Sequence, residues 1–473
     1  MAAGIVSWGT YLPYWRLDRK TIGLALGQPS GRGTRTVASY DEDTTTLGVE
    51  AARRALAAGA PVPEDLLFST PAPAYLDKTN ATTIHAALGL PSRVGAYDVG
   101  GSSRSAVAAV AAAAAVGTHV PALAVVADLR TGLSGGADER DGGDGAAALL
   151  FGPDGAVAEV VGGAASSDEF LDRWRVPGEM DSHVWEERFG EDVYVPLAHA
   201  AFADALKAAG VSADALDHVI VTGLHARAVK AVKGGIGAKV GADRSQTIGN
   251  LGAADAGVAL ADVLEQATPG QLIAVLALAD GADAMVLRTT ATLAEVQAAR
   301  RAAGVPTVEE QAGAGRSDLP YVRFLNWRGQ LRPDPPRRPD PERPGAPTAH
   351  RVEAWKYGFS ASRCLKCGFR HLPPTRVCLN CHAIDEMEPE RLADVRGKVA
   401  TFTVDRLAFS LSPPVVGVVV DFDGGGRYRC EMTDVDPDTV HIGQRVEMTF
   451  RRLWTAQGVH NYFWKAKPVE GSD

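Results

Sequence analysis

The segment Cys364–Cys381, CLKCGFRHLPPTRVCLNC, decides the fold of the C-terminal part of the chain. In each Cys-x-x-Cys pair the spacing lets a tight turn direct both sulfurs at one metal ion. Two such pairs, Cys364 with Cys367 and Cys378 with Cys381, predict a tetrahedral four-thiolate site for structural Zn²⁺. A redox role for either pair is the alternative, and it is disfavoured because no βαβ pattern surrounds them.

The chain has five cysteines, and all of them follow residue 360. The fifth, Cys430, lies in a strand pattern and is expected to be a buried apolar residue. A disulfide-linked protein would spread its cysteines along the chain, so this pattern favours metal ligands in a reducing compartment. The N-terminal segment lacks a secretory signal pattern, and the longest apolar run, 106–116, is too short to span a bilayer. We therefore expect a cytoplasmic protein with no membrane partner.

Beyond the zinc segment, runs of β-branched and aromatic residues alternate with turns. Five short strands in about 80 residues fit an OB-fold barrel, which we place at 391–473 after a zinc ribbon at 348–390. OB barrels also bind oligonucleotides, but the net charge of -9 and the acidic segments here disfavour a nucleic-acid partner. The strands are expected at Val399–Val404, Val415–Phe422, Tyr428–Thr433, Arg445–Arg451 and Tyr462–Lys465.

Before the zinc segment, residues 332–347 (RPDPPRRPDPERPGAP) predict a stiff, extended linker. The preceding residues are rich in Ala, Gly and Val, and strand-like runs alternate with helical ones. This alternation predicts an α/β protein with buried strands between helical layers. Expected strands include Gly4–Trp8, Leu123–Ala127, Val219–Thr222 and Leu272–Leu278, and expected helices include Thr44–Leu56, Val195–Ala209 and Asp255–Ala267.

Several of these segments are informative together. They are IVSWGTYLPYWRLDR and DEDTTTLGVEAARRAL near the start, GDGAAALLFG at 143–152, then TGLHARAVKAV, IGNLGAADAGVALADVL, ALADGADAMVLR and YVRFLNWRG. In this order they resemble the 3-hydroxy-3-methylglutaryl-CoA (HMG-CoA) synthases of the thiolase superfamily. The C-terminal remainder resembles the zinc-ribbon/OB-fold proteins that accompany thiolases and archaeal synthases, usually as a separate chain.

The resemblance implies two similar βαβαβ-type halves, at 1–165 and 166–331, packed as a five-layer α/β structure. Such proteins are usually homodimers that act on acyl-CoA or acyl-carrier thioesters, and an association with a thiolase partner is a further option. The family uses a cysteine nucleophile at a helix N-terminus, a histidine, an asparagine and, in the synthases, a glutamate acid/base.

Carried over residue by residue, the family's site is half preserved. TGLHAR supplies the histidine as His225, and IGN supplies the asparagine as Asn250. The cysteine is expected five residues after an aspartate, and counting from Asp98 in YDVGGSSRSAV gives Ser103. In STPAPAYLDK the glutamate position falls on Pro71. A thiolate and a carboxylate are thus both replaced.

These replacements argue against ordinary thiolase turnover, because a serine needs an adjacent base where a thiol does not. Ser103 is an acylated nucleophile in one interpretation. In a second, no acyl-enzyme forms, and His225 with Asn250 stabilises an enolate during a retro-aldol cleavage or a decarboxylation. In a third, the protein is a non-catalytic acyl-CoA-binding scaffold or carrier subunit, and in a fourth it catalyses a different reaction. We expect carbon–carbon bond making or breaking on a CoA thioester.

Other residues follow from the same resemblance. Lys230 and Lys233 fall where the family carries basic residues, and they are expected to contact the CoA phosphates. As residues of a solvated helix they need no such role. Arg104, next to Ser103, is expected to pair with Asp98 or with a carboxylate on the substrate.

Overall fold

The computed structural model describes residues 3–29, 31–236, 241, 243–337 and 339–469. They form two compact units, each of which is described by itself. The domain boundaries drawn from the sequence stay predictions. Unit 1 comprises Met1–Ala38, Glu50–Thr82 and Ser92–Tyr321, and unit 2 comprises Ser39–Val49, Thr83–Pro91 and Val322–Asp473.

Up to residue 327 the chain alternates strands and helices. The strands are β1 (Gly4–Tyr11), β2 (Trp15–Asp18), β3 (Thr34–Val37), β4 (Asp65–Ser69), β5 (Gly95–Asp98), β6 (Ala122–Asp128), β7 (Gly145–Gly152), β8 (Ala158–Ser166), β9 (Arg173–Trp174), β10 (His183–Val184), β11 (His218–Gly223), β12 (Leu272–Leu278) and β13 (Ala282–Thr289). The helices are α1 (Arg19–Leu26), α2 (Thr44–Ala55), α3 (Ala81–Leu88), α4 (Ser103–Val116), α5 (Ala137–Asp141), α6 (Glu187–Ala209), α7 (Ala226–Ile236), α8 (Asp255–Gln266), α9 (Thr292–Ala302), α10 (Val308–Gly313) and α11 (Tyr321–Trp327), with short 3-10 turns η1 (Ala213–Ala215) and η2 (Gly252–Ala254).

The main sheet of unit 1 repeats one strand pattern twice. Among the described residues its order is β11-β12-β13-β8-β1-β7-β6-β4-β5. In the first half β4 and β6 are parallel and β7 is antiparallel to β6. In the second half β11 and β12 are parallel and β13 is antiparallel to β12. The halves join where β1 meets β8. The repeat agrees with the two similar halves expected from the sequence.

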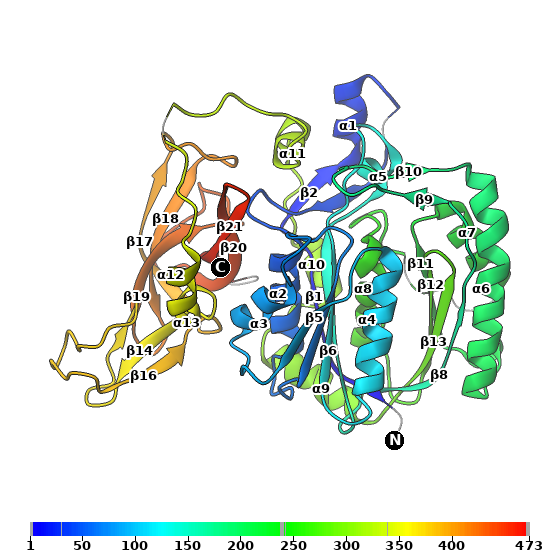
Figure 1. The fold of residues 1–473 in the computed structure, drawn as a ribbon, viewed down its shortest axis with the longest axis horizontal. Helices are drawn as coiled ribbons and strands as arrows, with labels where there is room; N and C mark the ends of the chain where they lie inside the picture. Colours follow the sequence, from blue (N-terminus) through cyan, green and yellow to red (C-terminus); the bar gives the residue numbers. More distant parts are fainter. Residues whose placement is uncertain (1–2, 30, 237–240, 242, 338, 470–473) are drawn as a thin grey trace. The chain divides into compact units, whose positions relative to one another are not determined.

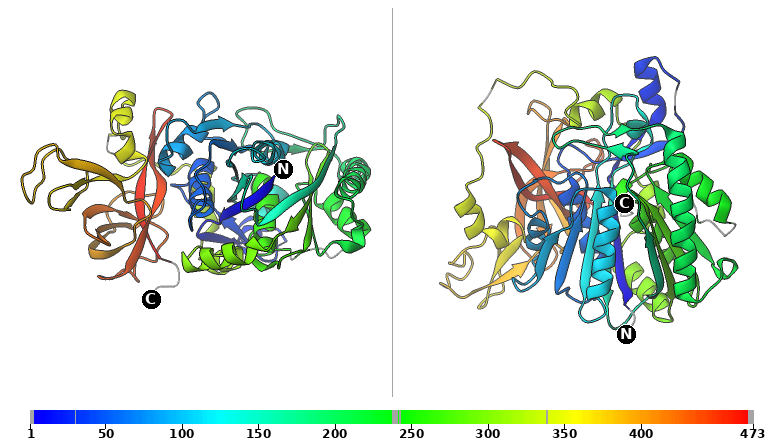
Figure 2. Two further views of the ribbon diagram at one scale, coloured as in Figure 1. Left: turned by 90° about the horizontal axis from the view of Figure 1, so that it is seen from below. Right: turned by 45° about the vertical axis from the view of Figure 1, so that its right-hand side comes forward.

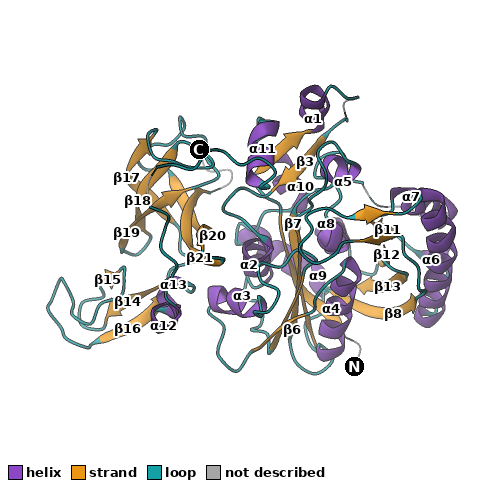
Figure 3. Ribbon diagram, turned by 45° about the horizontal axis from the view of Figure 1, so that its top comes forward, coloured by secondary structure: helices purple, strands orange, loops and turns teal. Residues whose placement is uncertain are grey.

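Helices separate and cover the two halves of this sheet. Figure 1 shows α4 and α8 between them, and α8 packs against β7 and β1 on one side and β11 and β12 on the other. Figure 3 shows α6 and α7 over the other face of β8 and β11–β13, which they contact. This layered arrangement confirms the predicted α/β fold class. Among the described residues no helix has the length and apolar character needed to cross a membrane.

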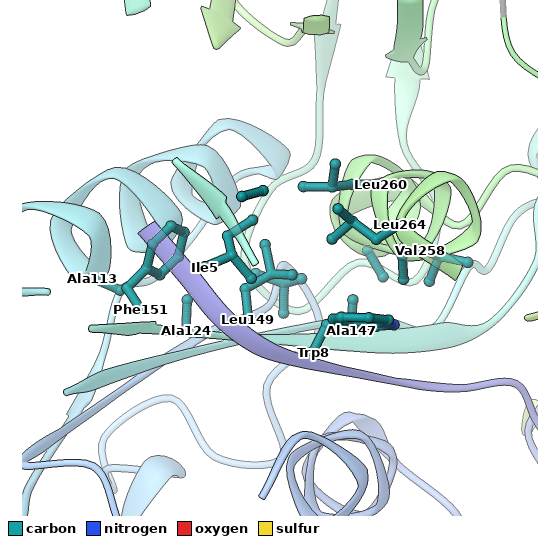
Figure 4. Close-up of a cluster of buried hydrophobic side chains, with 14 of the residues drawn as sticks. Ile5, Trp8, Ala113, Ala124, Ala147, Leu149, Phe151, Val258, Leu260 and Leu264 are labelled. Carbon is teal, nitrogen blue, oxygen red and sulfur yellow. The ribbon is translucent and has the colours of Figure 1, made fainter. Parts of the chain in front are cut away.

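Small side chains allow the central layers to approach closely. Figure 4 shows Ala113 of α4, Ala147 of β7 and Leu264 of α8 in one cluster, and all three are fully buried. A methyl group on Gly257 of α8 would lie 2.7 Å from the Cβ of Ala147. Strands β1, β6 and β7 are buried along their whole lengths. Accordingly β7 is wholly apolar, and β6 is apolar up to its last residue, Asp128.

Unit 2 contains a zinc ribbon followed by a closed barrel. The ribbon sheet has the order β15-β14-β16, and the barrel has the order β17-β18-β19-β21-β20, whose strands are orange to red in Figure 2. All five strands expected for an OB-type barrel are present. The elements are α12 (Ala346–Arg351), α13 (Glu353–Lys356), β14 (Ser360–Cys364), β15 (Arg370–His371), β16 (Met387–Arg391), β17 (Gly397–Asp405), β18 (Val415–Phe422), β19 (Arg427–Met432), β20 (Arg445–Ala456) and β21 (Val459–Pro468).

Buried ion pairs attach the segment Ser39–Val49 to the barrel within unit 2. Glu42 pairs with Arg451, and both side chains are 0 % exposed. Asp41 pairs with Lys465 at 2.9 Å. Although burial acts in the opposite direction, the charges of Lys465 and Arg451 lower the pKa of Asp41 to about 2. The acidic DED motif is therefore joined to the barrel by buried ion pairs.

Candidate active site

The expected nucleophile is the first residue of α4. Ser103 follows Ser102, whose backbone N–H donates to Ser105 Oγ at 3.3 Å. Gly101, with φ of 108°, allows the turn from β5 into the helix. The Ser103 hydroxyl is half-buried and has no hydrogen-bond partner in the described part of the chain. The structure thus places Ser103 where the resemblance implies a nucleophile, while no described side chain is bonded to it as a base.

His225 lies just after β11 and is 8 % exposed. Its Nδ1 accepts a hydrogen bond from the backbone N–H of Ala228 at 3.1 Å. In the neutral ring the proton is therefore on Nε2. Nε2 lies 3.9 Å from Asp172 Oδ1, and among the described residues neither atom has a hydrogen-bond partner. The imidazole N–H and the carboxylate oxygen are thus an unused buried donor and acceptor.

Asp172 is the residue that the sequence analysis missed. Burial raises the pKa of its carboxyl group, although the charge of His225 opposes the change. A carboxylate with a raised pKa is the stronger base. Gly190 in α6 makes room for the pair, because a methyl group there would lie 2.5 Å from both Asp172 Oδ1 and His225 Nε2. No sequence spacing marks this pair, since its members come from distant segments.

Asn250 bonds chiefly to the backbone beside His225. Its Nδ2 donates to the carbonyl of Gly223 at 2.8 Å, and its Oδ1 accepts from the N–H of Gly252 at 2.9 Å. Since Gly223 is the last residue of β11, the amide holds the loop that leads to the histidine. Among the described residues, the second N–H of the Asn250 amide has no hydrogen-bond partner.

The carboxyl ends of β4, β5 and β6 meet at one edge of the sheet, because these neighbours are parallel. Pro71 follows β4, Ser103 follows β5, and Asp128 ends β6. Where the resemblance implies a glutamate, the carbonyl of Pro71 accepts a hydrogen bond from the guanidinium of Arg175. Burial raises the pKa of Asp128, which accepts from the N–H of Ala253 in η2 at 3.0 Å. Three strand ends therefore converge at the start of α4.

Arg104 links this edge to the second half of unit 1. Its Nε lies 2.9 Å from Asp283 Oδ2, so its partner is Asp283 rather than Asp98, one of the partners expected from the sequence. Its Nη1 donates to the carbonyl of Asp280 at 2.6 Å, and the Asp280 N–H donates to the hydroxyl of Tyr194 at 3.2 Å. The Tyr194 ring lies 5.7 Å from the imidazole described above. The start of α4 is thus connected to the surroundings of His225 through the hydrogen bonds of Arg104 and Asp280.

The two lysines expected at the CoA phosphates lie on α7. Lys230 is exposed and has no ion pair with any described residue. The ammonium of Lys233 lies 3.6 Å from a carboxylate oxygen of Asp243. Their contact with CoA stays a prediction.

The zinc ligands predicted from the sequence come together in the ribbon. The four sulfurs lie within 4.8 Å of one another, with Cys364 Sγ 3.6 Å from Cys381 Sγ and Cys367 Sγ 3.5 Å from Cys378 Sγ. A tetrahedral shell with Zn–S bonds of about 2.3 Å has its sulfurs about 3.8 Å apart. The donor set therefore fits a structural zinc ion. Burial raises the pKa of Cys430 to about 12, and this thiol is not part of the cluster.

Comparison with known proteins supports the division into two parts. Residues 390–451 match the family model described as the C-terminal OB-fold domain of ChsH2. A DUF35 domain-containing scaffold protein of Methanocaldococcus jannaschii is 32% identical over 129 residues, which cover 25% of this chain and 91% of that protein. The hydroxymethylglutaryl-CoA synthase of Pyrobaculum neutrophilum is 27% identical over 355 residues, which cover 70% of this chain and 98% of that protein.

Solved structures share the fold. MvaS in complex with 3-hydroxy-3-methylglutaryl coenzyme A has a TM-score of 0.60 at 18% identity, covering 82% of this chain and 99% of that chain. The 3-oxoacyl-(acyl carrier protein) synthase III FabH from Pseudomonas aeruginosa has a TM-score of 0.55 at 20% identity, covering 61% and 98%. The first part of the chain therefore has the thiolase-like fold. This part has HMG-CoA synthase homologues that extend over 70% of the chain. The C-terminal part belongs to the DUF35 family and carries an OB-fold domain of the ChsH2 type.

Proposed function

We propose that this protein is an enzyme that makes or breaks a carbon–carbon bond in acyl-CoA, or acyl-carrier, thioesters without a covalent acyl-enzyme intermediate. The synthases among its relatives support the substrate class. The observation that carries the proposal is the buried Nε2–H of His225 facing the carboxylate of Asp172, with neither atom bonded to a described residue. Unused buried polar atoms are costly, and their retention at a site indicates a function.

Aldol-type chemistry uses this pair directly. In cleavage of a 3-hydroxyacyl thioester, Asp172 takes the hydroxyl proton, the Cα–Cβ bond breaks, and a carbonyl compound leaves. The electron pair moves into the thioester as an enolate, whose oxygen accepts a hydrogen bond from His225 Nε2–H. The proton then returns from Asp172 to Cα, which gives a shorter acyl thioester. Condensation follows the same steps in reverse.

Access to the pair requires a local movement. Both facing atoms are closed to solvent, so a substrate reaches them only when the segment that carries Asp172, residues 167–186, shifts outward. Closure of this segment over the substrate would exclude water from the enolate.

Acyl transfer through Ser103 is the second candidate, and its position at the start of α4 favours it because a helix N-terminus stabilises negative charge. Incubation with radiolabelled acetyl-CoA, followed by peptide mass analysis, separates the two routes. We expect no label on Ser103, and a labelled Ser103 peptide during turnover would establish the acyl-serine route instead.

A scaffold or carrier subunit is the non-catalytic candidate, as the name of the DUF35 relatives suggests for those proteins. We expect His225→Ala to bind CoA with unchanged affinity. Its rate with 3-hydroxyacyl-CoA thioesters should fall at least 100-fold, because the variant lacks the N–H that donates to the enolate oxygen, and about 100-fold is the usual size of such a loss. If the variant retained the wild-type rate with every thioester that the protein turns over, His225 would have no catalytic role. If the wild type bound thioesters but turned over none, the scaffold interpretation would replace ours.

Further proposals accompany this function. Zn²⁺ bound by the four cysteines is structural, and its thiolates need a reducing compartment, which supports a cytoplasmic location. We propose a homodimer, which is supported by β5 being the last strand of the sheet with Tyr97 54 % exposed. The scaffold-type relatives support association with a thiolase partner as an option.

A further inference from the structure

One ion pair fastens the segment that carries Asp172. Arg173, the first residue of β9, donates from Nη1 to Asp138 Oδ2 at 2.7 Å. Figure 1 shows α5, which holds Asp138, beside β9 and β10. Glu179 and His183 pair with each other inside the segment. Among the described residues, the Arg173–Asp138 contact is therefore the one pair of full opposite charges that joins residues 167–186 to the rest of the chain.

Asp138 is itself held in place by the first half of unit 1. Its Oδ1 accepts a hydrogen bond from Arg130 Nη2 at 3.2 Å. The backbone N–H of Arg130 in turn donates to the fully buried carboxylate of Asp144 at 2.8 Å. Although burial acts in the opposite direction, the hydrogen bond and the charge of Arg173 lower the pKa of Asp138. Asp138 is thus an ionised group, bound on its other side, to which the segment is attached.

Arg173 transmits this attachment to Asp172, because the two residues are neighbours in the chain. The short strand β9 pairs with β10 through Arg173 and Val184. The N–H of Trp185 donates to the carbonyl of Asp172 at 2.7 Å, so both strands of the hairpin hold the backbone at this point. The segment's other described hydrogen bonds to distant residues end on uncharged backbone carbonyls. The ion pair is therefore the contact that most directly sets where the Asp172 carboxylate lies.

We propose that Asp138 is a positioning residue, which binds Arg173 and thereby fixes Asp172 where its carboxylate faces His225 Nε2. This inference rests on the proposed function, because it assigns a role in that reaction to a residue that contacts no reacting atom. A displacement of about 1 Å at reacting groups lowers a rate roughly 100-fold, so a fixed point beside the base matters for the chemistry. The pair holds the segment 167–186 in its closed position over the site.

Exchange of the Cα protons of acetyl-CoA for deuterium tests this role. Asp138→Asn keeps the shape of the side chain and removes its charge. We expect it to bind CoA as the wild type does and to exchange about 10-fold to 100-fold more slowly. In an Asp172→Asn background it should add little further loss, because it acts through that carboxylate, whereas an equal loss in both backgrounds would overturn the inference. Arg173→Lys, which keeps the charge, should retain more of the rate than Arg173→Met.

The pH dependence of the exchange is a second readout. The titratable and charged groups that face Asp172 are His225, Arg173, Tyr194 and Asp280. Burial raises the pKa of Asp172, and the charges of His225 and Arg173 oppose this change. Because Asp172 acts as a base only when it is ionised, exchange falls as the pH falls through this pKa. Arg173→Met removes one opposing charge, so the fall should begin at a higher pH, and an unmoved profile would overturn the inference.

Glu179→Gln is the matched control, since it makes the same kind of change in the same segment but breaks an exposed internal pair with His183. It should exchange at the wild-type rate, and a loss equal to that of Asp138→Asn would show only a general charge effect and overturn the inference. Amide hydrogen exchange measures the positioning without turnover. Residues 167–186 should exchange their amide protons faster in Asp138→Asn than in the wild type.

The outcomes separate this inference from the function on which it rests. Wild-type rates of both kinds of exchange in a folded Asp138→Asn protein would overturn the inference and leave the proposed function standing. Absence of Cα exchange in the wild type with every thioester tested would overturn the proposed function itself. Thermal unfolding shows whether Asp138→Asn remains folded, and the two Arg173 variants carry the test if it does not.

Discussion

Replacing Gly190 with alanine tests whether the geometry of the His225–Asp172 pair matters for catalysis. The added methyl would lie 2.5 Å from Asp172 Oδ1 and from His225 Nε2, whereas ordinary contacts begin at 3.4 Å. The two polar atoms must therefore move by about 0.9 Å or the helix must shift. Such overpacking costs roughly 1–3 kcal/mol of stability. A displacement of about 1 Å at reacting groups lowers a rate roughly 100-fold.

The assay is the exchange of the Cα protons of acetyl-CoA and propionyl-CoA for deuterium in D2O, which reports enolate formation. Gly190→Ala should bind CoA normally and exchange roughly 100-fold more slowly than wild type. Gly163→Ala is the control, because its methyl would meet only the Ala284 carbonyl, at 3.5 Å. In an Asp172→Asn background Gly190→Ala should add little further loss, since both changes act on one pair. A folded Gly190→Ala protein with the wild-type exchange rate would refute the reasoning.

Three further predictions concern stability and the metal. Arg451→Met should destabilise unit 2 by about 3–5 kcal/mol in urea unfolding, because it removes the buried cation that pairs with Glu42 and Asp434. Arg427→Met, which breaks an exposed pair, should leave the midpoint in place. Burial raises the pKa of Glu265 from 4.5 to about 7, so the stability that its protonated form contributes is complete below pH 4.5 and is lost as the pH rises through 7. Glu265→Gln should therefore remove about 2–3 kcal/mol of this pH dependence, and an unchanged slope between about pH 5 and 8 would contradict the assignment. Cys378→Ser should lower the zinc content measured by atomic absorption and unfold the ribbon, and full retention of zinc would contradict the four-thiolate site.

The sequence was most informative where local pattern and spacing determine structure. Cys364 and Cys381 come together because two short turns and one hairpin are enough to bring the four sulfurs to one point. The spacing of the cysteines indicates both the turns and the hairpin. The buried strands β6 and β12 were predictable because strands covered on both faces read as continuous apolar runs. The barrel strands were predictable from runs of β-branched and aromatic residues between turns, as in β18.

The residues that complete the candidate site could not be predicted in this way. Asp172 meets His225 only through the packing of the segment 167–186 on α6, and no local pattern records that contact. The bond from Arg175 to the Pro71 carbonyl could not be predicted for the same reason. The tie between Glu42 and Arg451 spans most of the chain and likewise requires the fold.

Deuterium exchange with three variants tests the central claim most directly, namely that His225 and Asp172 form an enolate without an acyl-serine. The account predicts that Ser103→Ala exchanges the Cα protons of acyl-CoA at nearly the wild-type rate, while His225→Ala and Asp172→Asn each lose roughly 100-fold or more. Loss of exchange in Ser103→Ala, with wild-type exchange in His225→Ala and Asp172→Asn, would contradict it.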